Sequence, residues 1–414
     1  MSTAASTPEW AAILRAERKA RVGSVADMAR RLRGIAHEQG VQLPTLADLT
    51  RTIRGWERGD HYPSERYRLL CARALEMTEA DLFPPEHATV VPVPAFPLTS
   101  IAPDPDLFRR ITKAVEQPTR VDAVTLDWLA TCLAEHRKVE DSIGSRPLIG
   151  VVRQQLGVVA DFANSARGPL AERIVDLAAQ YAQFIAWMSL DIDDQPAALA
   201  WYDRAHDWAL EIGDANMATT TLSMKAHQAW SAGNARRCVG LAEAARSHSG
   251  QVTPGVRGMA AQMAARGHAL AGTADQAHAL LDEAENLISG AAEHSEDEPA
   301  WMYFYDETWF TLQRGMAELH LSNWAQAVEL LASGLVRLPE SYRRDRAWYA
   351  SCLARAHAKA GDAEASLSTA LPVVTDAVQL NRHAVKELAE TAGELGSRGA
   401  PHAVTLRDAL AAAR

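Results

Sequence analysis

The stretch DDQPAALAWYDRA, residues 193–205, sets a pattern that returns along the C-terminal part of the chain. Each copy begins with a turn rich in Gly, Asp or Asn and continues as a helix. Such turn residues end one helix and start the next, so the pattern predicts a series of helix pairs. The further copies are AGNARRCVGLAEA (232–244), AGTADQAHALLDEA (271–284), LSNWAQAVELLASG (321–334) and, more loosely, AGDAEASLSTAL (360–371).

A small side chain follows three to five residues into the helix of each copy. The successive separations of these positions are 40, 39, 50 and 39 residues. A period near 40 residues in an all-helical chain is typical of stacked helix pairs, that is, an α-solenoid. Because small side chains let two helices approach closely, we expect tight helix contacts at Ala198, Cys238, Ala277, Ala327 and Ser366.

These stretches resemble tetratricopeptide (TPR) repeats. The likeness is greatest at residues 193–205, where Ala198, Tyr202 and Ala205 match the pattern of the repeat's second helix. It covers roughly residues 160–380, although the repeats here are longer than the usual repeat of about 34 residues. The resemblance implies helical hairpins that stack around a concave groove.

The longest interval contains an aromatic segment, GAAEHSEDEPAWMYFYDETWF, at residues 290–310. We expect its acidic loop to run into a helix that carries six aromatic residues. Six aromatics within ten residues cannot share one helical face, so some should point into the groove. One interpretation is that they fill the core between long helices. The other is a ligand or peptide pocket, with charge from Asp306 and Glu307. The candidate ligand residues are Trp301, Tyr303, Tyr305, Asp306 and Trp309.

Composition sets the protein class. The 414 residues are 48% hydrophobic and 23% charged, as in ordinary globular proteins. Strand-like alternation is missing almost everywhere, so we expect an all-α protein. There is neither an apolar run of about 18 residues nor a signal peptide, which predicts a cytoplasmic protein without a membrane partner. The four cysteines lack metal-ligand spacing and are expected to be buried thiols: Cys71, Cys132, Cys238 and Cys352.

The distributions of charge and of proline along the sequence divide the chain into three expected parts. Residues 9–75 hold 13 Lys and Arg against 8 Asp and Glu, whereas the whole chain carries 42 against 52. A basic block on an acidic body indicates an anion-binding module, with chance fluctuation as the alternative. Seven prolines within residues 84–105 predict an extended linker. The expected parts are therefore 1–83, the linker 84–105 and a helical repeat domain over 106–414.

The N-terminal part has the pattern of a helical bundle. Helices are expected over residues 9–21, after Ser24, over 45–59 and over about 64–76. Asp27 lies three residues after Ser24, as in a capping box. The third helix ends at a glycine, as helices commonly do. Its predicted buried face consists of residues at helical spacing: Leu46, Leu49, Ile53 and Trp56.

The string Thr52-Ile53-Arg54-Gly55-Trp56-Glu57-Arg58-Gly59, followed by Pro63-Ser64, resembles the lambda-repressor/Cro-type (XRE-like) helix-turn-helix family. In that family such a string lies on the recognition helix and its exit. The resemblance implies binding of double-stranded DNA, with arginines reaching guanine edges in the major groove or phosphates. The alternative is a helical interaction bundle with solvated arginines. The candidate DNA-binding residues are Thr50, Arg51, Thr52, Arg54, Arg58, Arg66 and Arg68.

Signatures of catalysis are missing. The sequence has no phosphate loop, no HExxH and no catalytic triad that spacing supports, so we expect neither an enzyme nor a cofactor. It also predicts no cleft with strongly perturbed titratable groups. His136 and Glu140, like His383 and Glu387, are four residues apart on expected helices and could share a metal. We interpret both pairs as solvated helix faces and expect no metal.

Together these expectations describe a cytoplasmic transcriptional regulator. Its N-terminal bundle would bind operator DNA, and its TPR-like domain would dimerise, through residues 340–414, and sense a peptide or small molecule. The architecture resembles regulators of Gram-positive bacteria, and the 36 Arg against six Lys fit an actinobacterium. The rival hypothesis is a protein-interaction scaffold with a vestigial helix-turn-helix.

Overall fold

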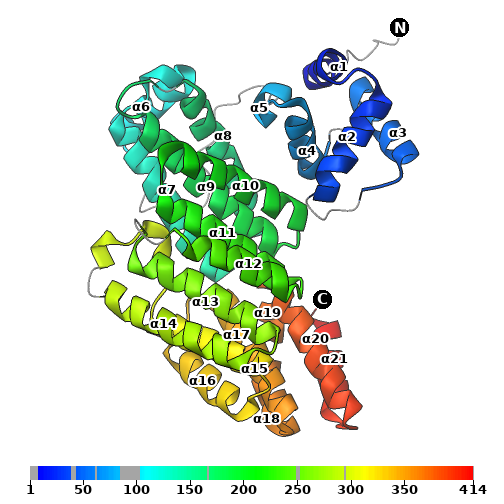
Figure 1. Ribbon diagram of the computed structural model, residues 1–414, viewed down its shortest axis with the longest axis vertical. Helices are drawn as coiled ribbons and strands as arrows, with labels where there is room; N and C mark the ends of the chain where they lie inside the picture. The colour runs from blue at the N-terminus through cyan, green and yellow to red at the C-terminus, as the bar shows by residue number, and fades with distance from the viewer. Residues whose placement is uncertain are drawn as a thin grey trace. The chain divides into compact units, whose positions relative to one another are not determined.

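The computed structural model describes residues 8–38, 43–60, 63–83, 103–165, 167–248, 252–292 and 295–413. Within these ranges every regular element is a helix and no strand occurs (Figure 1). The expected all-α class is therefore confirmed. The predicted linker 84–105 lies outside the described residues up to position 102, and its last residue, Pro105, already begins helix α6.

The chain divides into two compact units. The first comprises Met1–Pro97 and the short segment Gln195–Ala200, and the second comprises Leu98–Asp194 and Trp201–Arg414. The first unit contains helices α1 (Glu9–Arg21), α2 (Val25–Glu38), α3 (Leu46–Arg58), α4 (Glu65–Leu75) and the short α5 (Glu79–Leu82).

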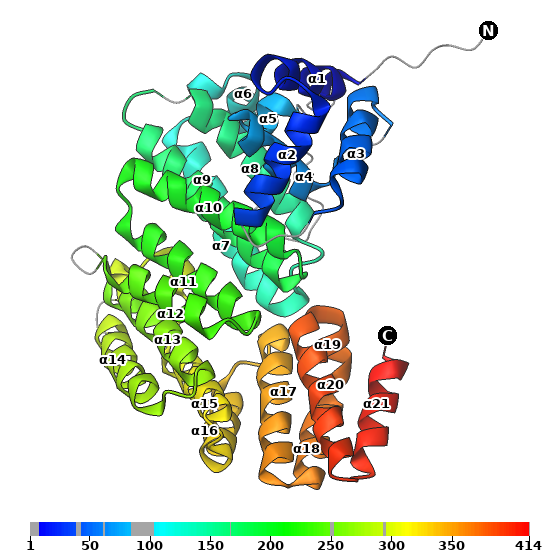
Figure 2. The ribbon, with the colours of Figure 1, turned by 45° about the vertical axis from the view of Figure 1, so that its right-hand side comes forward.

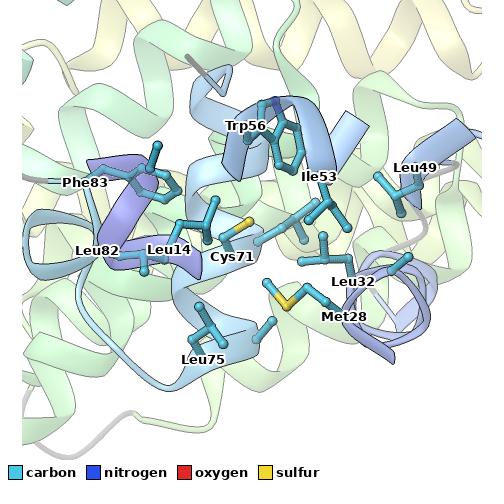
Figure 3. Close-up of a cluster of buried hydrophobic side chains, with 14 of the residues drawn as sticks. Leu14, Met28, Leu32, Leu49, Ile53, Trp56, Cys71, Leu75, Leu82 and Phe83 are labelled. Atoms are coloured by element: carbon cyan, nitrogen blue, oxygen red, sulfur yellow. The ribbon is translucent and has the colours of Figure 1, made fainter. Parts of the chain in front are cut away.

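One apolar core holds the first unit together. Side chains from all five helices point toward one another there (Figure 3). Residues spaced three and four apart on α3 bury the face that the sequence predicts, because an α-helix returns to the same side at that spacing. The largest contributors, each at most 1% exposed, are Leu14, Met28, Leu32, Leu49, Ile53, Trp56 and Leu75.

Local hydrogen bonds explain where these helices begin and end. The amide of Asp27 donates to the Ser24 hydroxyl at 3.1 Å, so Ser24 caps α2 as expected, and the hydroxyl itself donates to the Asp27 carboxylate at 2.5 Å. Thr45 caps α3 in the same way, accepting from the amide of Asp48 at 3.2 Å. Gly59 ends α3 with φ +81°, in the left-handed region that favours glycine.

A buried ion pair joins the first and third helices. The Arg18 guanidinium donates to both carboxylate oxygens of Glu57, at 2.5 and 3.1 Å, and both side chains are almost fully buried. Such a two-pronged arrangement fixes orientation as well as distance. Glu57 therefore positions α3 against α1.

The rest of the chain forms a further series of helices. They are α6 (Pro105–Glu116), α7 (Ala123–Ile143), α8 (Ile149–Ser165), α9 (Ala171–Asp191), α10 (Gln195–Ile212), α11 (Ala215–Ser231), α12 (Ala235–Arg246), α13 (Pro254–Leu270) and α14 (Ala274–Ala292). After the 3-10 turn Ala300–Met302 come α15 (Glu307–His320), α16 (Trp324–Arg337), α17 (Arg343–Ala360), α18 (Ala363–Ala370), α19 (Val374–Leu380), α20 (Arg382–Ser397) and α21 (His402–Ala412).

Neighbouring helices in the second unit pack as antiparallel pairs. From α11 to α14, and again from α15 to α18, each helix contacts the next one along the chain. The first helices of successive pairs also touch, α11 with α13, α13 with α15 and α15 with α17 (Figure 2). All five small side chains of the repeated pattern are fully buried: Ala198, Cys238, Ala277, Ala327 and Ser366.

The aromatic segment differs from its predicted form. We expected one helix to carry all six aromatics, but α15 begins only at Glu307 and includes Trp309 and Phe310 alone. The physical reason is local: Pro299 precedes a 3-10 turn, and Asp306 adopts extended backbone as the N-cap of α15. The preceding aromatics therefore lie on a turn, not on a helix.

A long-range contact closes the stack of helices. Helix α7 packs against α17, and Arg344 donates to Glu140 at 2.9 Å although the two residues are 204 positions apart. The Tyr303 hydroxyl also reaches α7, where it donates to Asp141 at 2.6 Å. These contacts bring α7, α17 and the turn at Tyr303 around a common interior.

Candidate ligand pocket and DNA-facing helix

A cavity of about 470 Å³ lies within the second unit. Its helical walls come from α7, α9, α11, α13, α15, α17 and α20, and the turn around Trp301 adds to them. The partner helices α12, α14 and α16 contribute no lining residue. The first helix of each of these pairs thus faces the cavity, and its volume falls in the range of small-molecule sites.

Aromatic side chains are concentrated around this cavity. Five of the eleven tryptophans of the chain line it: Trp187, Trp230, Trp301, Trp309 and Trp348. Large flat side chains offer broad apolar contact and a polar edge, which suits a ligand with a flat apolar body.

Three of the five predicted ligand residues line the cavity. Trp301 donates from Nε1 to Thr220 at 3.1 Å, and Tyr303 and Trp309 also contribute to the wall. Tyr305 is buried beside Trp309, with ring centroids 4.6 Å apart, and does not line the cavity. Asp306 is exposed and its carboxylate accepts from the amide of Trp309 at 2.8 Å, so it caps α15.

One end of the cavity holds an ion cluster around Arg344. This buried guanidinium lies 2.9 Å from Glu140 and 2.8 Å from Asp345, with Asp141 at 3.7 Å and Asp191 at 4.0 Å. Four carboxylates thus surround one cation, which leaves an excess of acidic groups at this end.

Burial perturbs the acids of this cluster. It raises the pKa of Glu140 to about 8 and that of Asp141 to about 6, although Arg344 opposes both shifts. The sequence predicted no cleft with strongly perturbed titratable groups, and that prediction is wrong. The physical reason is that the cluster joins α7, α9 and α17, which no local pattern brings together.

The two histidine–glutamate pairs are also not solvated faces, which corrects that interpretation. Glu140 and His136 are 2% and 1% exposed. Glu387 is buried and pairs with Arg355 at 2.8 Å. Both glutamates face the interior that α7, α17 and α20 enclose.

Arg266 of α13 occupies a different environment. Its guanidinium lies over the ring of Trp230, 3.8 Å from the centroid, and Nη1 lies 2.9 Å from Nδ1 of His227. Burial and the nearby cation lower the pKa of His227 well below its usual value. His227 therefore stays neutral and accepts from Arg266.

The candidate DNA-binding residues divide by exposure. Arg51 and Arg54 project from α3 into solvent, opposite the buried face. The half-buried Thr50 and Thr52 donate to carbonyls one turn back, at 2.7 and 2.9 Å. Arg58 is exposed and pairs with Asp60 at 2.6 Å.

Arg66 and Arg68 of α4 both contact other side chains of the first unit. Arg66 lies over the ring of Tyr67 at 4.7 Å. Arg68 pairs with Glu79 at 2.5 Å and donates to the carbonyl of Pro63 at 3.0 Å. Arg68 therefore links α4 to α5, and these contacts within the first unit occupy its guanidinium.

Sequence reasoning missed the charged residues of the cavity. One signal could have pointed to Arg266: it follows Met259–Ala265, a stretch of Met and Ala broken only by Gln262, so a charged residue there is unusual on an otherwise apolar segment. Arg344 gives no such signal, because α17 carries several arginines.

Within the described ranges, no cluster of three or more His, Cys, Asp or Glu is arranged to hold a metal ion. None of the described helices is long and apolar enough to cross a bilayer. Scanned against protein-family models and searched against curated proteins, the chain gave no match.

Proposed function

We propose that this protein is a transcriptional regulator that binds double-stranded DNA through α3 and responds to a ligand in the cavity of its second unit. The observation that carries the proposal is the two-sided character of α3. Leu49, Ile53 and Trp56 are buried on one side, while Arg51 and Arg54 are exposed on the other. A recognition helix needs this combination of an anchored face and a free basic face.

The arginines of α3 are available for new contacts. Arg54 has no hydrogen bond or ion pair to any residue in the described ranges. Arg51 pairs with Asp48 at 3.2 Å, but its side chain is 79% exposed. An exposed pair of this kind contributes about 0–1 kcal/mol, so a phosphate or a guanine edge can displace the aspartate.

The second unit would supply the switch. A ligand that binds one arrangement of the stacked helices more tightly shifts the population toward it. Because the first helices of several pairs line the cavity, a ligand there contacts many of the elements whose stacking sets the shape of the unit. We further propose a cytoplasmic homodimer, in which this shape sets the spacing of two DNA-binding bundles.

The test compares Arg54→Ala with Arg15→Ala, which removes the same charge from α1. Fluorescence anisotropy measures binding to a duplex from the gene's own promoter and to a scrambled duplex, at two salt concentrations. We expect Arg54→Ala to remove most of the preference for the promoter duplex, a loss of about 1–3 kcal/mol, while Arg15→Ala keeps that preference. Equal preference in both variants would contradict the assignment of α3.

The protein-interaction scaffold is the second candidate. It is favoured by the acidic partners that Arg51, Arg58 and Arg68 already have within the first unit. Affinity for DNA should fall steeply with salt, whereas affinity for a peptide in an apolar groove should change little. Weak binding to DNA that vanishes at physiological salt, equally in both variants, would favour the scaffold.

A further inference from the structure

Arg266 is a buried cation without an acidic partner. The residue is 3% exposed, and no carboxylate of the described chain lies within ion-pair distance of its guanidinium. Its contacts are His227, the ring of Trp230 and two methionine sulfurs. Its Nε hydrogen, also buried, has no acceptor among these residues. All of these contacts are neutral.

Two other arginines of the cavity have acidic partners, and a third, Arg137, donates to the side chain and the carbonyl of Gln180. Arg344 has four carboxylates around it, and Arg355 pairs with Glu387 and Glu390 at 2.8 and 2.9 Å. A buried charge without a counter-charge is costly, and an aromatic face compensates only part of that cost. The hydrogen-bonding capacity of Arg266 is therefore only partly used.

We propose that Arg266 binds the anionic group of the ligand, a carboxylate or a phosphate, while the aromatic walls hold a flat apolar body. Arginine presents a planar fork that matches either anion with two parallel hydrogen bonds. His227 and Trp230 hold the guanidinium in place at the cavity wall. This inference rests on the cavity being the ligand site of the proposed function.

The opposite charge character of the two ends sets the orientation. Four carboxyl groups already surround Arg344 and occupy its hydrogen-bonding capacity, whereas the surroundings of Arg266 lack acidic groups. Trp187 lies between these ends, with the Arg344 guanidinium 4.9 Å from its ring and His227 5.8 Å from it, centroid to centroid. An aromatic acid can stack there while its anionic group points to Arg266.

Isothermal titration calorimetry on the full chain tests this with three probes. 1-Naphthaleneacetate supplies a carboxylate, 1-naphthyl phosphate supplies a phosphate, and 1-naphthaleneacetamide has the shape of the first without its charge. We expect at least one anion to bind and the amide to bind about tenfold to a hundredfold more weakly. The preferred anion identifies the class of ligand.

Arg266→Gln should weaken binding of the preferred anion by about tenfold or more and leave the amide unchanged. The matched control is Arg257→Gln, an exposed arginine on the same helix, which should change neither. Equal binding of acid and amide, binding that Arg266→Gln does not weaken, or failure of both anions to bind would each overturn the proposal.

A second variant of Arg266 tests whether a loss of binding comes from misfolding. If Arg266 is an unpaired cation kept for a ligand, Arg266→Met should leave the thermal midpoint of the ligand-free protein unchanged or raise it, because the thioether suits the neighbouring methionines. A fall of more than about 5 °C would show a structural role and overturn the inference. None of these measurements uses DNA, so their failure is distinct from failure of the recognition helix.

Discussion

Gly59 is a position of the N-terminal bundle at which only glycine fits without strain. Its φ of +81° strains any side chain, and a β-carbon there would lie 2.4 Å from the ring Cδ of Pro8. Gly34, in the middle of α2, is the opposite case: a β-carbon would meet no atom within 4 Å. The same substitution should therefore have opposite effects at the two sites.

We expect Gly59→Ala to destabilise the bundle by about 1–2 kcal/mol or more, and Gly34→Ala to stabilise it by up to about 1 kcal/mol. Hydrogen exchange of the α3 amides measures the effect in the full chain. Faster exchange in Gly59→Ala and slower or equal exchange in Gly34→Ala is the expected result. Equal exchange rates in the two variants would contradict the role of Gly59.

Glu140 makes stability depend on pH. Its pKa in the folded protein is raised to about 8 by burial, so between its unfolded pKa and pH 8 the folded state binds the extra proton. Stability from this group is complete below the unfolded pKa and is lost as pH rises through 8. From pH 7 to 8 the loss is about 1 kcal/mol.

The window from pH 7 to 8 separates this effect from that of the histidines. Below pH 7, histidines with a lowered pKa have the opposite effect, because their contribution to stability increases as pH rises through 6.5. These histidines are His136, His206, His227, His320 and His357. The thermal midpoint of the wild type should fall from pH 7 to 8, and Glu140→Gln should remove most of that fall. A slope that persists in the variant would contradict the assignment to Glu140.

Residues could be predicted where their role is local. Leu49, Ile53 and Trp56 follow the helical period, and their burial follows from it. Arg266 and Arg344 act through neighbours on other helices, and periodicity along one helix contains no information about those neighbours. That is why the predicted site included aromatic residues of the cavity but none of its arginines.

At the scale of elements, α15 tests the role of Asp306. The sequence predicted a ligand residue here, but the carboxylate caps the helix. We expect Asp306→Ala to destabilise α15 by about 1 kcal/mol and Asp306→Asn to have little effect, because asparagine is an equally good cap. Denaturant unfolding of both variants measures this, with titration of a naphthalene probe as the second readout. Weaker probe binding in Asp306→Asn, with stability unchanged, would restore the ligand role.

Helix ends were predicted better than the aromatic segment for a physical reason. Ser24 and Thr45 act within three residues, so their caps can be identified from sequence. Six aromatic residues within ten positions suggest a helix by composition, yet Pro299 and Asp306 have extended backbone on either side of the turn. The backbone conformation at these two residues, and not the aromatic composition, therefore determines where α15 begins.

At the scale of the whole molecule, the repeat period predicted the paired helices but not the closure between α7 and α17. The residues that close the stack, Glu140 and Arg344, are 204 positions apart. A repeat of about 40 residues describes contacts between neighbours only. Closure depends on the accumulated turn of the whole stack, which no single repeat determines.

Arg344→Gln should loosen this closure. It leaves buried carboxylates without their cation, so we expect amide exchange of α7 to accelerate although the substitution lies on α17. The control is Arg343→Gln, an exposed neighbour that pairs with Asp376 at 2.5 Å and does not reach α7. Unchanged exchange in α7 of Arg344→Gln would contradict the closure.

The division between first and second helices of each pair has a consequence for evolution. Helices α9, α11, α13, α15 and α17 supply cavity residues, whereas α12, α14 and α16 supply none. Substitutions on the outer surfaces of α12, α14 and α16 change the exposed surface of the protein without changing the residues that line the cavity. In such a chain the outer surface can change while the cavity stays the same, and the cavity can change while the outer surface stays the same.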